Sequence, residues 1–419
     1  MAFNPVKRVR ERRYPSAMQA ELAEKLTMLA ALPPVSETPY LTVSLDWRPS
    51  GSDPEYRAAM QVFEREAHRL QQEHWPRGDI FDSLGSDIEK IRTWLTSEVD
   101  PATRGILIVA NSGADVFETV SLGLPLENRV VGGAVPALLP LARLDEDNPT
   151  YAVLLADQQN AYLSLISQAH RVEELAMASS DYPRKQHSGG WSQRRFQQRA
   201  DERIMALGRQ ISSEVQQYME DREIEMLILA GDEVITSTFD RTMPEALKER
   251  VIDTIRLDIQ ATTSEVIEAT LPIAERAEAD RELESARMVV EAIKRGGAGA
   301  GGSDDVFAAL AEGKVNTLVM NEDYHEDGWA DFVNRRYGAG ERGDVFDGQV
   351  GEFSAAPIIA EDEMVRLAIQ NGAEIDIIHT GVKIEREPND QLPDAGQIPR
   401  AEAARLLDKY GGVAALLHY

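Results

Sequence analysis

The sequence predicts a protein of mixed α/β class with three domains. Strand and helix patterns alternate along most of the chain, and this alternation is typical of sheets covered by helices. Apolar residues recur every three or four positions in the expected helices. The length of 419 residues is sufficient for several buried cores. We expect an N-terminal α/β domain over residues 1–148, a middle domain over 149–281 and a C-terminal domain over 282–419.

Composition excludes several classes of protein. The net charge of −27 argues against a protein coated in nucleic acid, so RNA contacts are expected only at local basic segments and DNA is not an expected partner. The absence of cysteine removes disulfides and thiolate metal sites, and the seven histidines show no metal-ligand spacing. No cofactor is therefore expected. Apolar runs shorter than roughly 18 residues and a basic start without an apolar core predict a cytoplasmic protein with no membrane partner.

The N-terminal domain should begin with a basic tail and one helix that ends before Pro33 and Pro34. The pattern after this helix predicts an α/β unit, and the acidic turn Asp145–Pro149 is interpreted as the domain boundary. The expected elements are a helix over about 16–31, a strand at Tyr40–Leu45, helices over 54–74 and 84–97, and strands at Gly105–Ala110 and Val116–Val120.

The middle domain should open with a hairpin of two strands joined by the polar turn Asp157–Asn160. A long amphipathic helix follows, whose apolar face is formed by Phe196, Ala200, Ile204, Leu207, Ile211, Val215 and Tyr218. Pro272 is expected to kink or split the last helix. The other expected elements are strands at Tyr151–Ala156, Ala161–Ile166, Arg171–Ala176 and Met226–Gly231, a helix started by Pro244, and a helix from an N-cap at Ser264 to Lys294.

The C-terminal domain should alternate helices and strands as an α/β sandwich. Gly296–Gly302 is interpreted as a flexible loop without the lysine of a phosphate-binding loop, and the acidic insertion between Asn321 and Ser354 as a surface loop. The acidic clusters Asp145–Asp147 and Glu361–Glu363 are interpreted as solvated charge or as helix N-terminal complement. The expected elements are 304–311, 315–320, 361–370, 374–378, 401–409 and 413–418.

The segment DYPRKQHSGGWSQRRF, residues 181–196, carries the main functional signal. Residues 181–203 hold six positive charges against three negative ones, a local reversal within an acidic chain. The paired glycines Gly189 and Gly190 permit close backbone approach to another molecule, and a basic tip suits a phosphate backbone. Trp191 has the ring needed to stack on an unpaired base. The alternative is an ordinary surface loop with its arginines on a solvated helix face.

This segment resembles the catalytic loop of the eukaryotic and archaeal class-one peptide release factor and Pelota superfamily, with Trp191 where those proteins have glutamine. TYAVLLADQQNAYLSLI, EMLILAGDEV, GKVNTLVMNED and KYGGVAALLHY resemble further parts of that superfamily in the same order over roughly residues 150–419. The bacterial branch, which includes Balon-like hibernation factors, is the closest fit. The resemblance implies a ribonuclease H-like middle domain and a ribosomal-protein-like α/β/α C-terminal domain.

The resemblance also implies a function and a set of RNA-binding residues. We expect a ribosome-binding factor that occupies the A site, in hibernation or rescue, with its loop on ribosomal RNA at the peptidyl-transferase centre and with tRNA as a further contact. Residues 1–148 lack a stop-codon-reading motif such as Asn-Ile-Lys-Ser, so codon-specific termination is unsupported. The expected RNA-binding residues are Arg184, Lys185, His187, Gly189, Gly190, Trp191, Ser192, Arg194, Arg195 and Arg199.

Two other functions remain open. The first is peptidyl-tRNA hydrolysis at Gly189, Gly190 and Trp191, where the backbone N–H of Trp191 would help to stabilise developing negative charge; the indole lacks the amide of glutamine, and no catalytic residue is assigned. The second is a protein-interaction module, because the C-terminal domain of relatives docks a translational GTPase.

Overall fold

The computed structural model describes eleven stretches of the chain, which form two compact units. One unit is built from residues 148–281. The other combines residues 21–147 with 282–382 and 399–419. Every structural statement below concerns the described residues, which are 17–35, 38–50, 57–72, 79–146, 149–157, 160–167, 170–179, 192–222, 224–340, 356–379 and 397–418.

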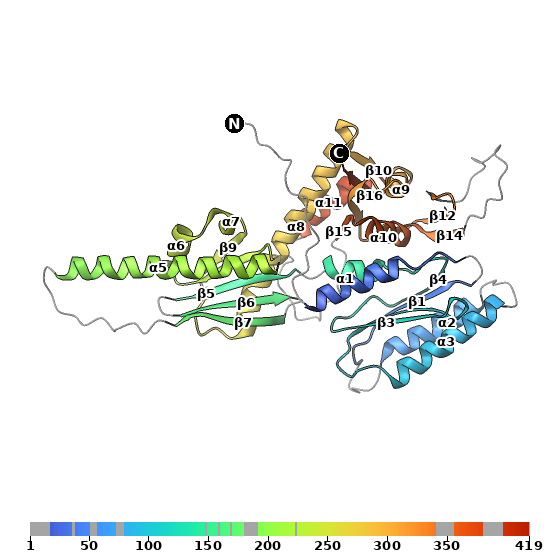
Figure 1. Ribbon diagram of the computed structural model, residues 1–419, viewed down its shortest axis with the longest axis horizontal. Coiled ribbons are helices and arrows are strands. Elements are labelled where there is room, and N and C mark those ends of the chain that lie inside the picture. Colours follow the sequence, from blue (N-terminus) through green and yellow to red (C-terminus); the bar gives the residue numbers. More distant parts are fainter. Residues whose placement is uncertain are drawn as a thin grey trace. The chain divides into compact units, whose positions relative to one another are not determined.

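The unit of residues 148–281 contains a five-stranded sheet in the order β7-β6-β5-β8-β9 (Figure 1). The predicted hairpin is confirmed, since β5 and β6 pair antiparallel, with Tyr151 opposite Ile166 at one end and Ala156 opposite Ala161 at the other. The strand β8 pairs in parallel with β5, and β9 pairs in parallel with β8. The strands are β5 (Tyr151–Ala156), β6 (Asn160–Ser167), β7 (His170–Ser179), β8 (Leu227–Gly231) and β9 (Val251–Ile255).

Alternation along the strands sends apolar side chains to both faces of this sheet. Leu154 of β5 joins a core under helices α5 (Ser192–Asp221), α6 (Glu233–Thr242) and α7 (Glu245–Lys248). Its neighbour Val153 joins the opposite core, which is closed by the first half of α8 (Thr263–Arg295). Because both faces are covered by helices, the unit has the three-layer α/β arrangement that the resemblance implies for a middle domain.

Two helices differ from the prediction in this unit. The helix α6 was not predicted: Asp232 caps it by accepting hydrogen bonds from the N–H groups of Val234 and Ile235, both at 2.9 Å. The helix α8 is neither split at Pro272 nor capped by Ser264. Thr262 and Glu265 instead form a reciprocal capping box. Buried contacts on both sides of the proline, at Val266 and Ala274, keep the helix continuous.

The N-terminal part of the other unit is an antiparallel sheet in the order β3-β2-β1-β4. Helices α2 and α3 cover one face, and α1 and α4 pack on the other; β4 and α4 were not predicted. The elements are α1 (Ala17–Ala30), β1 (Tyr40–Asp46), α2 (Ala58–Gln72), α3 (Asp79–Ser97), β2 (Gly105–Asn111), the 3-10 turn η1 (Ser112–Ala114), β3 (Val116–Leu122), β4 (Arg129–Gly133) and α4 (Leu139–Glu146). The predicted acidic turn is therefore partly helical.

The C-terminal part has a sheet in the order β10-β16-β11-β15, with helices on both faces. The second half of α8 and α11 cover one face, and α9 and α10 cover the other. The elements are β10 (Gly299–Gly301), α9 (Ser303–Ala311), β11 (Val315–Asn321), α10 (Ala360–Asn371), β15 (Glu374–Ile378), α11 (Gln397–Asp408) and β16 (Val413–Leu417). The α/β class is thus confirmed here as in the other parts.

Two predicted loops of the C-terminal part are wrong. Gly299–Gly301 pairs with β16 as an edge strand. Glycine fits there because Ile293 and Tyr410 occupy the space that a Cβ atom on Gly299 or Gly301 would need. The acidic insertion contains β12 (Asp327–Asp331) and β13 (Arg336–Ala339), which form a three-stranded sheet with β14 (Ala356–Ile359). All three strands are short, and only β14 pairs over a long sequence separation, so the strands leave little periodic signal.

The acidic cluster Glu361–Glu363 is buried, which corrects its interpretation as solvated charge. The exposed fractions of these three residues are 3%, 3% and 0%. They do start helix α10, but their carboxylates are buried, and each lies against a basic side chain. Arg129 lies 2.7 Å from Asp362, His325 2.6 Å from Glu361, and Arg366 2.6 Å from Glu363. Sequence position alone gave no sign of these distant partners.

Candidate nucleic-acid interface

The predicted loop lies outside the described residues, whereas its supporting helix lies within them. Arg184, Lys185, His187, Gly189, Gly190 and Trp191 are in residues 180–191, between the end of β7 and the start of α5. Ser192, Arg194, Arg195 and Arg199 belong to the first turns of α5, of which the backbone is described. The structure therefore fixes the two elements that the loop connects.

The C-terminal half of α5 is anchored in the core of its unit. Ile211 and Val215 are buried against the sheet, with exposed fractions of 1% and 0%, as the helical spacing predicted. Met219, which was not among the predicted residues, is also buried there, with an exposed fraction of 0%. Gly208 lies so close to α6 that a Cβ atom there would stand 2.8 Å from Oγ1 of Thr242. This close approach fixes where α5 crosses α6.

Polar contacts join the end of α5 to the edge strand β7. The hydroxyl of Tyr218 donates a hydrogen bond to Oε2 of Glu173 over 2.7 Å. The guanidinium of Arg222 lies 3.9 Å from the centre of the Tyr218 ring and 3.3 Å from Glu173. Burial, followed by this hydrogen bond, raises the pKa of Tyr218, so the phenol keeps its proton at physiological pH. These contacts hold the end of α5 against β7, the strand that precedes the glycine segment in the sequence.

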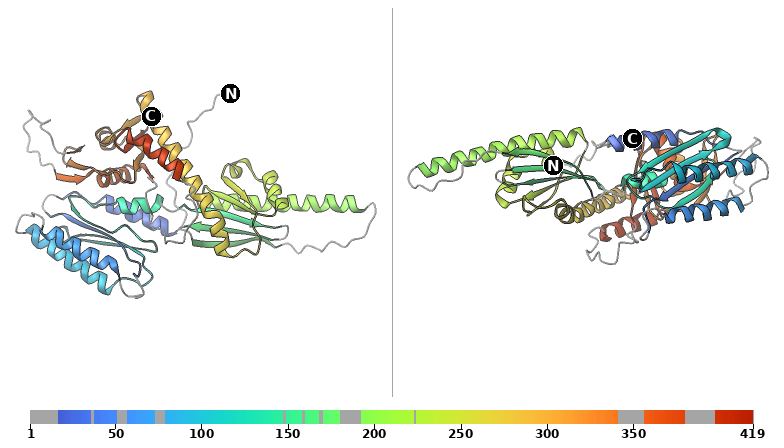
Figure 2. Two further views of the ribbon diagram at one scale, coloured as in Figure 1. Left: turned by 180° about the vertical axis from the view of Figure 1, so that it is seen from behind. Right: turned by 90° about the horizontal axis from the view of Figure 1, so that it is seen from below.

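The N-terminal half of α5 extends beyond the sheet. Figure 1 shows these turns projecting past the ends of β5, β6 and β7, and the view from behind in Figure 2 agrees. Among the side chains that are described, Leu207 is the first along α5 to pack against the core. From Ser192 to Leu207 the helix rises about 22 Å. The start of α5 is therefore held well away from the sheet of the unit.

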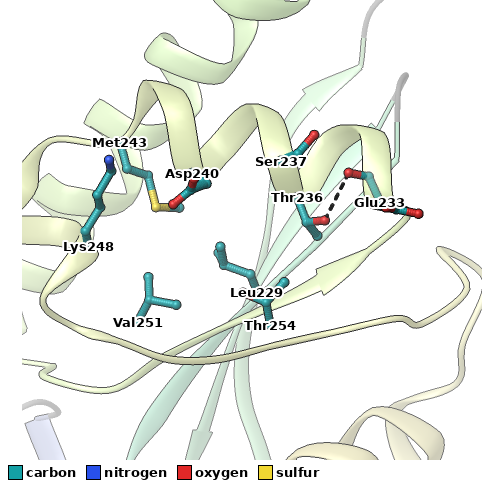
Figure 3. Close-up of a pocket in the computed structure, with 9 residues that line it drawn as sticks. All are labelled: Leu229, Glu233, Thr236, Ser237, Asp240, Met243, Lys248, Val251 and Thr254. Atoms are coloured by element: carbon teal, nitrogen blue, oxygen red, sulfur yellow. Dashed lines mark hydrogen bonds between the residues drawn. The ribbon is translucent and has the colours of Figure 1, made fainter.

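A pocket of about 400 Å³ lies between α6, α7 and the strands β8 and β9 (Figure 3). Leu229, Met243 and Val251 contribute apolar side chains to its lining, and Glu233, Asp240 and Lys248 contribute charged ones. The hydroxyl of Thr236 donates to the backbone oxygen of Glu233 over 3.4 Å, as the dashed line indicates. Among the residues that the structure describes, no predicted site residue lines this pocket. Neither the pocket nor α6 was predicted, and the Asp232 cap was the available signal.

The described residues offer no centre for metal chemistry. Within them, no group of three or more histidine, aspartate or glutamate side chains is arranged to hold a metal ion. None of their helices combines the length and apolar character needed to cross a lipid bilayer. The geometry favours the projecting end of α5, with the basic segment before it, as the candidate interface.

Comparison with known proteins finds similar chains. Residues 136–275 match the family described as bacterial archaeo-eukaryotic release factor family 10. The chain is 26% identical over 260 residues to peptide chain release factor subunit 1 of Methanocaldococcus jannaschii, covering 58% of this chain and 62% of that relative. It is 28% identical over 193 residues to the Methanopyrus kandleri protein of the same name, covering 44% and 46%. The chain thus matches less than two thirds of the length of these relatives.

Solved structures give weaker likenesses. The crystal structure of the archaeal translation termination factor aRF1 has 17% identity and a TM-score of 0.25, covering 96% of this chain and 98% of that one. Archaeoglobus fulgidus Pelota has 16% identity and a TM-score of 0.28, covering 75% and 79%. With TM-scores below 0.5, these likenesses carry no functional argument. The family match and the curated relatives agree that this chain is similar to archaeo-eukaryotic release factors over the parts that they cover.

Proposed function

We propose that this protein is a ribosome-binding translation factor that occupies the A site during hibernation or rescue. Its basic Gly-Gly loop would lie near the peptidyl-transferase centre and contact ribosomal RNA there. The observation that supports the proposal is that α5, the 30-residue helix that directly follows this segment in the sequence, is anchored by its C-terminal half. A rigid projecting helix suits a tip that must reach a recessed site.

Charge supports RNA as the partner of the loop. Arg184, Lys185, Arg194 and Arg195 flank the glycines in a chain whose net charge is −27. Cations in such a local cluster displace the counterions of a phosphate backbone, which is favourable at low salt. The matched relatives are named peptide chain release factors, and peptide release is a reaction of the ribosome. The acidic remainder of the chain disfavours indiscriminate RNA binding.

Co-sedimentation with ribosomes from stationary-phase or stalled-translation extracts tests the proposal. The wild-type protein should sediment with ribosomes at low and moderate salt. Replacing Arg194 and Arg195 together by glutamine should move it toward the soluble fraction. The matched control is Arg209→Gln, which removes an exposed arginine about 22 Å further along the same helix. Wild-type protein that stays soluble throughout would refute the proposal.

Peptidyl-tRNA hydrolysis is a second candidate function, favoured by the names of the matched relatives. The reaction needs water placed against the ester between peptide and tRNA, together with donors for the developing oxyanion. Trp191 lacks the side-chain amide of glutamine but keeps its backbone N–H group. Release of a labelled peptide from ribosome-bound peptidyl-tRNA, compared between wild type, Trp191→Gln and Trp191→Ala, decides between a catalyst and an occupant.

The resemblance further suggests a translational GTPase as partner of the C-terminal part. Affinity capture of the full chain from a cell extract, followed by identification of the bound proteins, tests this suggestion. Recovery of ribosomal proteins and a translation GTPase is the expected result. Recovery of an unrelated partner without either would favour a protein-interaction module.

A further inference from the structure

The hairpin between β12 and β13 carries an exposed tip formed by Val333, Asn334, Arg335 and Arg336, here called the hairpin tip. All four residues are exposed, and Val333 is 91% exposed, the highest value among the described large apolar residues that are exposed. The tip carries two consecutive arginines on a strongly acidic chain. Exposed apolar and cationic side chains together mark a surface that meets another molecule.

The tip has a fixed conformation. The carboxylate of Asp331 accepts hydrogen bonds from the backbone N–H groups of Val333 and Asn334, both at 3.1 Å, and from Nδ2 of Asn334 at 2.6 Å. Burial alone would raise the pKa of Asp331, but these hydrogen bonds hold it below its ordinary value, so the carboxylate stays charged. Arg335 takes the left-handed conformation, with φ of 52°. The turn is therefore organised before any partner binds.

The base of the hairpin packs against helices α9 and α10. The ring of Tyr337 stacks on Phe307 of α9 with 5.8 Å between centroids and meets Phe332 edge-on at 6.2 Å. Arg366 of α10 lies 5.8 Å from the centre of the Phe332 ring. This aromatic base fixes the direction in which the tip projects, so its cations are presented at a defined position.

We infer that the hairpin tip is a second RNA-contacting element, which binds the phosphate backbone of folded ribosomal RNA. A protein partner of a specific interface usually needs about 800 Å² of contact with buried aromatic or arginine anchors, which a four-residue convex turn does not supply. A phosphate contact needs one well-placed cation, and Arg335 provides it. Val333 then packs against a ribose or a base beside that phosphate. The inference extends the proposed function and rests on it for the identity of the RNA.

Binding of the full chain to purified ribosomes at several salt concentrations tests the inference. Arg335→Asn removes the charge while keeping a residue that tolerates the left-handed conformation. It should weaken binding and reduce the salt slope by up to about 0.9, as for one lost phosphate contact on double-stranded nucleic acid. Val333→Ser should weaken binding with an unchanged slope. The matched control, Arg295→Gln, removes an arginine whose side chain is 74% exposed at the end of α8 and should change neither quantity.

A photo-reactive phenylalanine analogue in place of Val333 identifies the partner. Crosslinks to ribosomal RNA support the inference, whereas crosslinks confined to protein overturn it. If Arg335→Asn leaves affinity and slope unchanged while the Arg194 and Arg195 variants weaken binding, the hairpin tip is not a contact and the proposed function stands. If wild-type protein does not bind ribosomes, the proposed function fails. Protein-free ribosomal RNA then tests the tip, and unchanged binding by Arg335→Asn overturns the inference.

Discussion

Buried charge in the first turns of α10 is the feature with the largest energetic consequence at the scale of single residues. Arg366 donates to both carboxylate oxygens of Glu363, at 2.6 and 2.7 Å, and both residues are almost completely buried. Arg366 also donates to the backbone oxygen of Ala30, at the end of α1. The pair therefore links helices that are more than 300 residues apart in sequence, and neither partner can be removed without leaving the other desolvated.

Glu363→Gln should lower the free energy of unfolding by about 3–5 kcal/mol, because it leaves the buried guanidinium without a counter-charge. The double change Glu363→Leu with Arg366→Met should cost much less, since it removes both charges from the interior. Urea unfolding of the full chain measures both. Asp280→Asn is the control, because it breaks an exposed ion pair with Arg276 and should change the free energy by less than about 1 kcal/mol. Equal costs for the single and double changes would contradict this account.

The imidazole of His325 should make stability depend on pH. Its hydrogen bond to Glu361, helped by Asp327 and opposed by Arg129, raises the pKa of His325 above its ordinary value near 6.5. A raised folded-state pKa means that the charged form stabilises the fold at acidic pH, and that this stability is lost as pH rises through the folded-state pKa. Wild type should exceed His325→Gln in melting temperature by more at pH 5.5 than at pH 8.5. A difference that grows with pH would refute this reading.

At the scale of elements, long periodic segments were predictable and short non-local ones were not. The face of α5 from Leu207 to Tyr218 and the β5–β6 hairpin follow from local pattern, and both are confirmed. The strands β12 and β13 are only five and four residues long, and β14 pairs with β12 from about 30 residues away, so local pattern did not reveal them. Pro272 does not split α8, because tertiary packing on both sides of it overrides the local preference of one residue. The candidate site is predicted from the sequence as a basic segment before a helix, and the projection of that helix came from the structure.

The crossing of α5 and α6 should be sensitive to volume at Gly208. Gly208→Val would place a Cβ atom within 3.1 Å of both Thr238 and Thr242, so the helices must separate or tilt. We expect lower stability and weaker ribosome binding together, because the direction of the projecting end of α5 changes. Gly85→Val on α3 is the control, since a Cβ atom there meets nothing within 4 Å. Hydrogen exchange along α5 and ribosome co-sedimentation provide the two readouts, and intact binding by Gly208→Val would show that the crossing does not position the loop.

At the scale of the whole molecule, two parts that are distant in sequence share one core. Leu107 of β2 and Leu139 of α4 belong to the same apolar cluster as Phe307 of α9 and Met364 of α10. Arg129 of β4 adds ion pairs to Asp362 and Glu361 across this contact. Residues 21–147 and the C-terminal part should therefore unfold together, while residues 148–281, which have their own two cores, should unfold separately.

Arg129→Met should destabilise only the unit that contains it. The change leaves Asp362 buried without its cation, at a cost of about 2–3 kcal/mol, and protonation of Asp362 limits the loss because burial raises its pKa. Hydrogen exchange should accelerate in β1, β2 and β11 alike, with no change in β5 or β8. Lys25→Met, which removes a half-exposed pair with Glu118, is the matched control. Acceleration confined to residues 21–147 would mean that the two parts unfold independently.

The salt dependence of ribosome affinity tests the central claim most directly. Affinity of the full chain for purified ribosomes is measured from low to moderate salt for wild type, Arg184→Gln, Lys185→Gln, Arg194→Gln and Arg195→Gln, with Arg209→Gln as control. The account predicts that each loop variant binds more weakly and with a smaller salt slope, by up to about 0.9 per lost phosphate contact, while the control matches wild type. Loop variants that keep wild-type affinity and slope would show that this loop does not contact ribosomal RNA.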